Sequence, residues 1–231
     1  MGRIVDKRTF YSQPKISATY DEQRFGGPSG ARVNAREIGI ALEMIPPEGR
    51  VLDLACGTGR LARALADRGQ EAIGLDYSPP MATRAAAAGV PAVIGDGFAT
   101  PFAGGTFDAV VSLRFAFHYA ELGPLLAEMR RLGRPGAALV FDTYSWSPRS
   151  VIPFRAQRWG GVVHLHSRRE VAEAATHIGL RVERVYPCFL FSPYLYRLVP
   201  LPLERALEAI EPRVPSSLLC RVFWKLLVVK N

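Results

Sequence analysis

Three aspartates at the ends of short apolar runs have the residue type and spacing to hold a polar, partly cationic ligand. Asp53 lies within the first apolar run after residue 50, Asp76 ends the next run, and Asp96 follows the third. A buried carboxylate, as expected at Asp53, is costly unless it meets a cation or several hydrogen-bond donors. At the end of a strand, a carboxylate such as Asp76 can accept hydrogen bonds from both hydroxyls of a ribose. The three acids therefore indicate a ligand that carries a charged group and a sugar.

The segment VLDLACGTGRLA, residues 51–62, runs from a strand through small residues into a helix. Ala55, Gly57 and Gly59 allow backbone amides and the helix N-terminus to approach a ligand closely. Gly57, Gly59 and Ala62 also fit the loose G-x-G-x-x-A pattern of dinucleotide-binding proteins. That pattern is weak alone, because the glycines could simply tighten a strand-to-helix turn.

Short apolar runs alternate with helical stretches around these residues, which is typical of a parallel sheet built from β-α-β units. Strands are predicted at Arg50–Ala55, Glu71–Asp76, Pro91–Gly95, Thr106–Leu113, Ala137–Thr143, Leu180–Tyr186 and Cys220–Val229. Helices are predicted at Arg60–Arg68, Pro80–Ala88, Leu122–Leu132, Arg168–His177 and Leu203–Ile210. The last strand is long and is a candidate edge strand.

The composition favours one globular α/β domain, since 48% of the 231 residues are hydrophobic and 22% are charged. No stretch reaches the roughly 18 to 20 apolar residues that span a bilayer. The N-terminal residues lack the apolar segment of a signal peptide, so a cytoplasmic location is expected. Three cysteines without C-x-x-C spacing argue against a disulfide framework or a structural zinc site, and no metal is expected.

Five segments in order, VLDLACGTGRLA, AIGLDYSPPM, GDGF, TFDAVVSLRFAFHY and LGRPGAALVFDTY, carry a family resemblance. Over about residues 50–186 the chain resembles the class I S-adenosylmethionine-dependent methyltransferases, and their small-molecule type 11 branch most closely. Ala55 departs from the glycine that the family more often has. The resemblance implies an α/β, Rossmann-like fold with a seven-stranded, mostly parallel sheet, helices on both faces and an antiparallel last strand.

One methyltransferase domain is expected over residues 1–231. It would comprise an N-terminal helical extension or lid over residues 1–49 and a donor-binding core over residues 50–143. Acceptor-side insertions and the C-terminal strands would occupy residues 144–231.

Carried over residue by residue, the resemblance implies a site for S-adenosylmethionine, whose product is S-adenosylhomocysteine. Asp53 would face the ammonium group and Asp76 the ribose diol, while Asp96 would accept from the adenine amino group. The other implied donor-binding residues are Ala55, Gly57 and Gly59 at the methionine moiety, Tyr77, Met81, Gly97 and Phe98 at the adenine, and Leu113 and Arg114 at the methyl-donor side.

His118, just after the fourth predicted strand, is the candidate general base or acceptor-orienting residue, because a histidine in this place commonly faces the acceptor in related enzymes. A packing histidine is the alternative. Methyl transfer is an in-line displacement that depends mainly on proximity and a dry pocket, so a base is needed only if the acceptor loses a proton. Tyr11 and Tyr20 are implied lid residues, and Tyr144 and His166 are acceptor-side candidates.

The predicted function is methyl transfer from S-adenosylmethionine to oxygen, nitrogen or carbon of a small molecule. The glycine pattern leaves an NAD(P)-dependent Rossmann oxidoreductase as an alternative, although Asp53 and the lack of a Tyr-x-x-x-Lys pair disfavour it. The net charge of +8 is the only support for an RNA methyltransferase, and no specific nucleic-acid partner is expected. A donor-binding scaffold without catalysis is a third alternative.

The apolar segment Phe189–Leu203 is consistent with three different roles. It fits a channel for an acceptor with an apolar part, a membrane-surface contact or a homodimer interface. The sequence does not decide among them. Separately, the aromatic and arginine side chains of Tyr144–Gly161 could clasp an anionic or aromatic acceptor.

Overall fold

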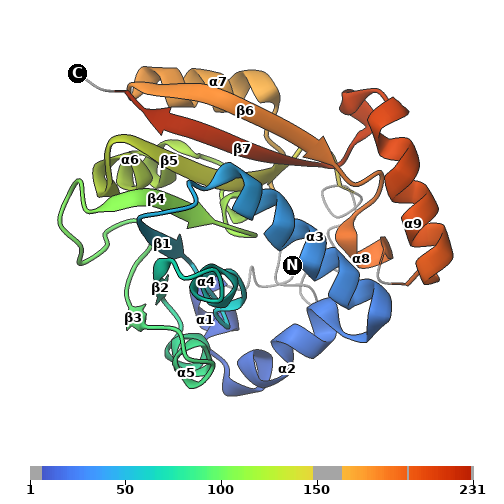
Figure 1. Ribbon diagram of the computed structural model, residues 1–231, viewed down its shortest axis with the longest axis horizontal. Helices are drawn as coiled ribbons and strands as arrows, with labels where there is room; N and C mark the ends of the chain where they lie inside the picture. Colours follow the sequence, from blue (N-terminus) through green and yellow to red (C-terminus); the bar gives the residue numbers. More distant parts are fainter. Residues whose placement is uncertain (1–6, 148–162, 197, 230–231) are drawn as a thin grey trace, which may run out of the picture.

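The computed structural model describes residues 7–147, 163–196 and 198–229. Its seven strands form one sheet in the order β3-β2-β1-β4-β5-β7-β6 (Figure 1). Strand β7 is antiparallel to both of its neighbours, β5 and β6, and the remaining neighbouring pairs are parallel. The strands are β1 (Arg50–Leu54), β2 (Glu71–Asp76), β3 (Ala92–Ile94), β4 (Phe107–Ser112), β5 (Gly133–Tyr144), β6 (Leu180–Cys188) and β7 (Arg221–Val228). The predicted α/β fold with a mostly parallel sheet and an antiparallel last strand is confirmed.

Helices cover both faces of the sheet, as predicted (Figure 1). They are α1 (Lys7–Tyr11), α2 (Pro14–Phe25), α3 (Gly27–Met44), α4 (Arg60–Ala66), α5 (Pro79–Ala87), α6 (Gly123–Leu132), α7 (Arg168–His177), α8 (Pro193–Tyr196) and α9 (Leu201–Ile210), with 3-10 turns η1 (Ala116–His118), η4 (Glu211–Arg213) and η5 (Ser216–Leu218). Ile40 of α3 and Leu65 of α4 belong to one core cluster, whereas Met129 of α6 and Val171 of α7 belong to the other. Two apolar layers therefore hold the sheet between helices.

Strand β7 corrects one prediction, because it lies inside the sheet and not at its edge. Phe223 and Trp224 are both buried, and the Trp224 indole N–H donates to Thr143 Oγ1 at 2.9 Å. The run is apolar on both faces of the strand, which is the pattern of a strand that is covered on both sides. Strands β3 and β6 are the ends of the described sheet.

Local sequence signals determine where helices α7 and α9 begin. Helix α7 begins with the predicted capping box, in which Ser167 and Glu170 satisfy each other's backbone N–H groups. Helix α9 begins at Leu201, two residues before the predicted start, since Pro202 is tolerated in a first helical turn. None of the described helices is long and apolar enough to cross a membrane.

Candidate active site

One cavity at the carboxyl ends of β1, β2 and β4 brings together most of the residues that the sequence singled out. Its lining includes Tyr11, Tyr20, Asp53, Ala55, Gly57, Asp76, Tyr77, Met81, Asp96, Gly97, Phe98, Leu113, Arg114 and His118. Three predicted site residues, Gly59, Tyr144 and His166, are not part of this lining. The sheet topology explains the convergence, because the ends of parallel strands meet at one edge and ligands bind in the crevice there.

Asp53 is a buried carboxylate at the end of β1, with 2% of its surface exposed. Its Oδ2 accepts a hydrogen bond of 3.1 Å from the Ala62 N–H in the first turn of α4. Burial raises the pKa of Asp53 to about 7, although the Ala62 N–H and the charge of Arg60 act in the opposite direction. A ligand cation brought against this carboxylate would offset its desolvation.

The turn between β1 and α4 has a left-handed backbone at three positions. Ala55 has a φ of 62°, Gly57 of 57° and Gly59 of 82°. A side chain at Gly57 would project into open space, whereas a Cβ at Gly59 would lie 2.9 Å from the Cβ of Ala85. Gly57 therefore keeps the cavity wall thin, and Gly59 allows α4 to approach α5. At Ala55, where the family more often has glycine, the left-handed backbone costs about 1 to 2 kcal/mol.

Asp76 is oriented by the same turn. One of its oxygens accepts from the Gly57 N–H at 2.8 Å, and the other accepts from the Ser78 N–H at 2.9 Å. Burial raises the pKa of Asp76, while these two N–H groups lower it. Each oxygen keeps a further lone pair, so the carboxylate can still accept from two neighbouring hydroxyls.

Asp96 already has a cationic partner from the N-terminal segment. Arg8 Nη2 lies 2.6 Å from Asp96 Oδ2, and the Arg8 guanidinium lies 4.7 Å from the centroid of the Tyr77 ring. Phe98 donates its N–H to Asp96 Oδ1 at 3.0 Å. Arg8 was not predictable as a site residue, because its position in α1 gives no signal of a partner 88 residues away.

Aromatic rings form the wall beside Asp96. The rings of Phe98 and Tyr119 meet edge to face at 4.7 Å, and those of Phe115 and Tyr119 at 5.0 Å. All three side chains line the cavity. The predicted flat partner Phe98 is thus one member of a cluster that offers ring surfaces to a planar ligand.

The N-terminal helices α1 and α2 contribute Tyr11 and Tyr20 to the cavity lining and contact the loops that follow β1 and β2. Ser78 donates its hydroxyl to the Tyr11 carbonyl at 2.8 Å, and Thr58 donates to Asp21 Oδ1 at 2.8 Å. The Tyr11 ring lies 5.8 Å from the ring of His118 and 6.1 Å from the ring of Tyr20. These contacts place Tyr11, Tyr20 and His118 in one aromatic group that lines the cavity.

Arg114 lines the cavity, but its guanidinium is committed to a buried partner. It donates through Nε to Glu37 Oε2 at 2.9 Å and through Nη2 to Glu37 Oε1 at 2.6 Å. Arg221 also pairs with Glu37, and Asp142 accepts from the Arg114 backbone N–H at 2.6 Å and from Arg221 Nε at 2.8 Å. Burial raises the pKa of Glu37, but Arg114 and Arg221 outweigh it and lower that pKa to about 2.

This buried network of Glu37, Arg114, Asp142 and Arg221 fixes α3 to the ends of β4, β5 and β7. Arg114 has a φ of 60°, a left-handed conformation that is uncommon for a residue with a side chain. The network restrains that backbone, and with it the cavity wall between Leu113 and Phe115. Sequence reasoning missed Glu37, because an acid within an amphipathic helix ordinarily indicates a solvated face.

Tyr144 and His166 are buried in the protein interior and do not line the cavity. Tyr144 is 2% exposed and packs edge to face on Phe117 at 4.8 Å, and burial raises its pKa to about 12. His166 is 4% exposed and donates its backbone N–H to the Tyr144 carbonyl at 2.9 Å. Neither residue is part of the described lining of the cavity, and their role at the acceptor stays a prediction. The predicted clasp of aromatic and arginine side chains after Tyr144 falls largely on residues 148–162, outside the described residues.

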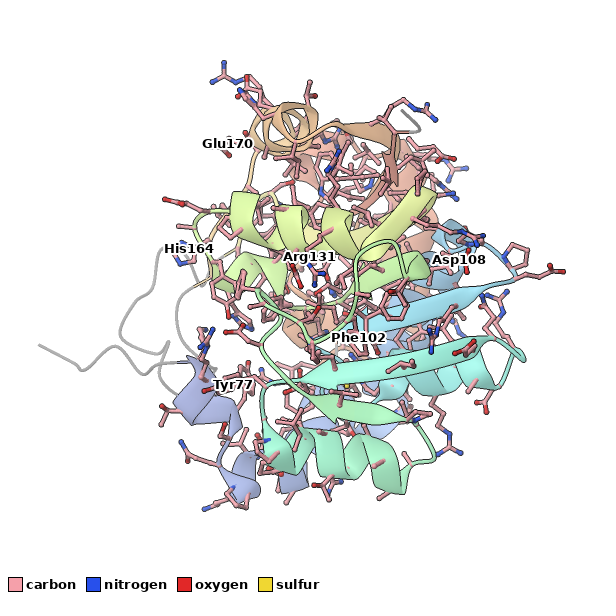
Figure 2. All side chains as sticks on the ribbon, turned by 90° about the vertical axis from the view of Figure 1, so that its left-hand side faces the viewer. Tyr77, Phe102, Asp108, Arg131, His164 and Glu170 are labelled. Carbon is pink, nitrogen blue, oxygen red and sulfur yellow. The ribbon has the colours of Figure 1, made fainter. Side chains whose placement is uncertain are left out.

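Asp108 has a structural role at the other end of the sheet from Tyr77 (Figure 2). It accepts from the Arg50 backbone N–H at 2.7 Å and forms an ion pair with Arg134. These contacts fix the starts of β1 and β5. Among the described residues, no group of three or more His, Cys, Asp or Glu side chains is placed to hold a metal ion.

Comparisons with known proteins agree with this geometry. Residues 52–141 match a family model described as a methyltransferase domain. The demethylmenaquinone methyltransferase of Thermus thermophilus is 40% identical over 127 residues, which are 51% of this chain and 56% of that protein. A probable tocopherol O-methyltransferase of Oryza sativa is 28% identical over 158 residues, 62% of this chain and 41% of the relative. The chain thus spans about half the length of these curated relatives.

Solved structures share the fold. The geranyl diphosphate C-methyltransferase of Streptomyces coelicolor superposes with a TM-score of 0.65 at 20% identity, covering 86% of this chain and 82% of the other. An S-adenosylmethionine-dependent methyltransferase of Mesorhizobium loti gives a TM-score of 0.63 at 19% identity, covering 82% and 96%. The matched residues 52–141 run from β1 into β5 and include the three strand-end acids. Over residues 52–141 the chain is thus similar to the methyltransferase-domain family, and over most of its length it has the fold of the solved methyltransferases.

Proposed function

We propose that the protein transfers a methyl group from S-adenosylmethionine to an oxygen, nitrogen or carbon atom of a small molecule. The observation that carries this proposal is the convergence of Asp53, Asp76 and Asp96 on one cavity at the ends of three neighbouring parallel strands. The surroundings of the three carboxylates differ, and each suits a different part of S-adenosylmethionine. Asp53 is buried and needs a cation, Asp76 keeps two free lone pairs, and Asp96 lies beside a wall of aromatic rings.

The bound donor would supply a methyl group that is already activated by a sulfonium. Asp53 would hold the ammonium group and Asp76 the ribose diol, while the thin turn at Gly57 lets the backbone approach the ligand. The lid residues Tyr11 and Tyr20 would exclude water and align the acceptor. His118 would accept the acceptor's proton where one must leave.

The acceptor that we propose is a small molecule with an apolar part. The names of the relatives refer to demethylmenaquinone and tocopherol, and a structural neighbour to geranyl diphosphate. The cavity supports this class, because Tyr11, Phe115 and His118 give its lining an aromatic character. Labelled methionine fed to a deletion strain and its parent would identify the acceptor as the methylated metabolite missing from the deletion strain. A highly polar product would contradict the proposed class.

Asp76→Ala is expected to weaken binding of S-adenosylhomocysteine by about 10- to 100-fold, because a hydrogen bond to a charged group contributes about 1.5 to 3 kcal/mol. Calorimetric titration of both proteins measures the change. Asp67→Ala, which alters an exposed acid after α4, is the matched control and should bind like the wild type. Unchanged affinity in a folded Asp76→Ala variant would show that the ribose lies elsewhere.

Arg8→Ala is expected to bind S-adenosylhomocysteine up to about fivefold more tightly, because Arg8 holds the carboxylate that the adenine amino group would use. The estimate follows from the roughly 0.2 to 1 kcal/mol of a partly exposed ion pair. Lys15→Ala, an exposed change on α2, is the control for the same calorimetric titration. Weaker binding by Arg8→Ala would show that Arg8 holds the donor and does not compete with it.

Two further hypotheses have specific tests. An RNA acceptor would give methylation of bulk tRNA or rRNA from a deletion strain and none of RNA from the parent. Donor binding without turnover over a broad panel of acceptors would favour a scaffold. A cytoplasmic location and a homodimer stay predictions of the sequence.

A further inference from the structure

Helix α9 turns its acidic residues inward. Glu204, Glu208 and Glu211 recur at helical spacing and pair with two arginines of α3. Arg32 pairs with Glu204 and Glu208, and Arg36 pairs with Glu208 and Glu211. Glu204 is completely buried and Glu211 is 5% exposed. These ion pairs fix α9 to α3 through a polar interface.

Several apolar residues of α9 face outward, whereas Leu207 packs against the core. Leu203 is 50% exposed and Ile210 is 47% exposed, and Ala206 between them is also exposed. Their spacing of i, i+3 and i+7 puts them on one face of the helix. A surface helix ordinarily buries such a stripe, so this helix has the reverse of the usual orientation. Leu198, just before it, is 71% exposed, and Figure 1 shows α9 at the edge of the molecule, beside α3 and α8.

The charges around this stripe are all of one sign. In residues 198–219, the exposed charged side chains are Arg205 and Arg213, because every acid of the segment is turned towards α3. We call Leu203, Arg205, Ala206, Ile210 and Arg213 the α9 surface. It combines exposed apolar area with positive charge, and the nearest partly exposed acid, Glu208 with 32% of its side chain exposed, is paired with Arg32 and Arg36.

The combination of apolar side chains and positive charge distinguishes between two binding partners, a second copy of the chain and an anionic bilayer. A two-fold dimer through the α9 surface would place the same patch on both subunits and bring arginines of like charge together. An anionic bilayer instead offers hydrocarbon to the leucine and isoleucine, and phosphate groups to the guanidinia at their rim. The net charge of +8 adds long-range attraction to a negative surface.

We propose that the α9 surface docks the protein on the surface of a membrane that contains anionic phospholipid. The helix lies in the plane of the interface, with Leu203 and Ile210 inserted and Arg205 and Arg213 at the level of the phosphate groups. Tyr196 of α8 and Leu207 of α9 pack with the core cluster that contains Phe117, the neighbour of His118.

Sedimentation of the full chain with sucrose-loaded vesicles tests the proposal. Vesicles of phosphatidylcholine alone are compared with vesicles in which about one third of the lipid is phosphatidylglycerol. The wild-type protein is expected to sediment with the anionic vesicles, and added salt is expected to weaken its binding. Arg205→Ala with Arg213→Ala should lower the partition coefficient by about 25-fold, at about fivefold for each arginine. Leu203→Ser with Ile210→Ser should lower it by about tenfold.

Matched controls come from elsewhere on the described surface. Ile94→Ser removes an apolar side chain that is 57% exposed at the sheet edge, and Arg63→Ala with Arg84→Ala removes two exposed arginines of α4 and α5. Both controls should bind vesicles like the wild type. Far-ultraviolet circular dichroism and thermal unfolding confirm that every variant is folded.

Three outcomes would overturn the proposal. The first is wild-type protein that binds neither type of vesicle, which would leave an acidic protein partner as the better occupant. The second is a folded Leu203→Ser, Ile210→Ser variant with full vesicle binding. The third is a wild-type dimer in solution that this variant abolishes, since the α9 surface would then be a subunit interface. None of these measurements depends on donor binding or methyl transfer.

Discussion

His118→Ala is expected to lower turnover by about 10² to 10⁴-fold and to leave the affinity for S-adenosylhomocysteine unchanged, which are the effects of removing a general base. The imidazole lies 5.8 Å from the ring of Tyr11, and both side chains line the cavity. Steady-state rates with the acceptor identified by isotope labelling, together with calorimetric titration of the product, measure both quantities.

The pH profile separates a base from a packing residue. Only neutral imidazole accepts a proton, so the wild-type rate should fall as the histidine is protonated at low pH. His177→Ala changes an exposed histidine at the end of α7 and is the control. A folded His118→Ala variant with full turnover and the wild-type pH profile would remove His118 from the catalytic residues and leave proximity as the main catalytic device.

Glu37→Gln is expected to reduce the free energy of unfolding by about 3 to 5 kcal/mol, because it leaves two buried guanidinium groups without their shared carboxylate. Arg221 and Glu37 are completely buried, and Arg114 is 8% exposed. Urea unfolding at neutral pH measures the loss. Because the network also restrains Arg114 in the cavity wall, donor affinity should fall in the same variant.

The matched control is Glu43→Gln, on the same helix. The Glu43 side chain is 66% exposed and lies 3.4 Å from Arg184, so its removal should cost less than about 1 kcal/mol. Equal losses in the two variants would contradict a special role of the buried network. The pH dependence has a defined sign, because the folded-state pKa of Glu37 is about 2, below its usual 4.5. Its stabilisation is complete above about pH 4.5 and is lost as pH falls towards 2.

The sheet and the donor side of the site follow from local sequence features. Asp53, Gly57 and Asp76 stand where strands end, and the ends of parallel strands meet, so their convergence was predictable. Local patterns also gave the capping box of α7. The position of β7 inside the sheet was not predictable in this way, because the sequence of a strand does not show which distant strands it pairs with. Strand β7 was therefore wrongly expected at the edge.

The partners of the site could not be predicted, because they come from distant parts of the chain. Arg8 meets Asp96 across 88 residues, and Glu37 meets Arg114 across 77. Neither arginine has a local pattern that distinguishes it from a solvated one. The orientation of α9 was unpredictable for the same reason. Its acids face inward because they pair with Arg32 and Arg36 of α3, which are distant in the sequence.

Calorimetric titration of the wild-type protein with S-adenosylhomocysteine and with NADH, at pH 6 and pH 8, tests the central claim most directly. We expect S-adenosylhomocysteine to bind and NADH to give no heat of binding. Binding should be about tenfold tighter at pH 8, because the pKa of Asp53 is raised to about 7 and only its ionised form pairs with the ammonium group. Failure to bind S-adenosylhomocysteine at millimolar concentration, or binding of NADH in its place, would contradict the assignment of the cavity as a methyl-donor site.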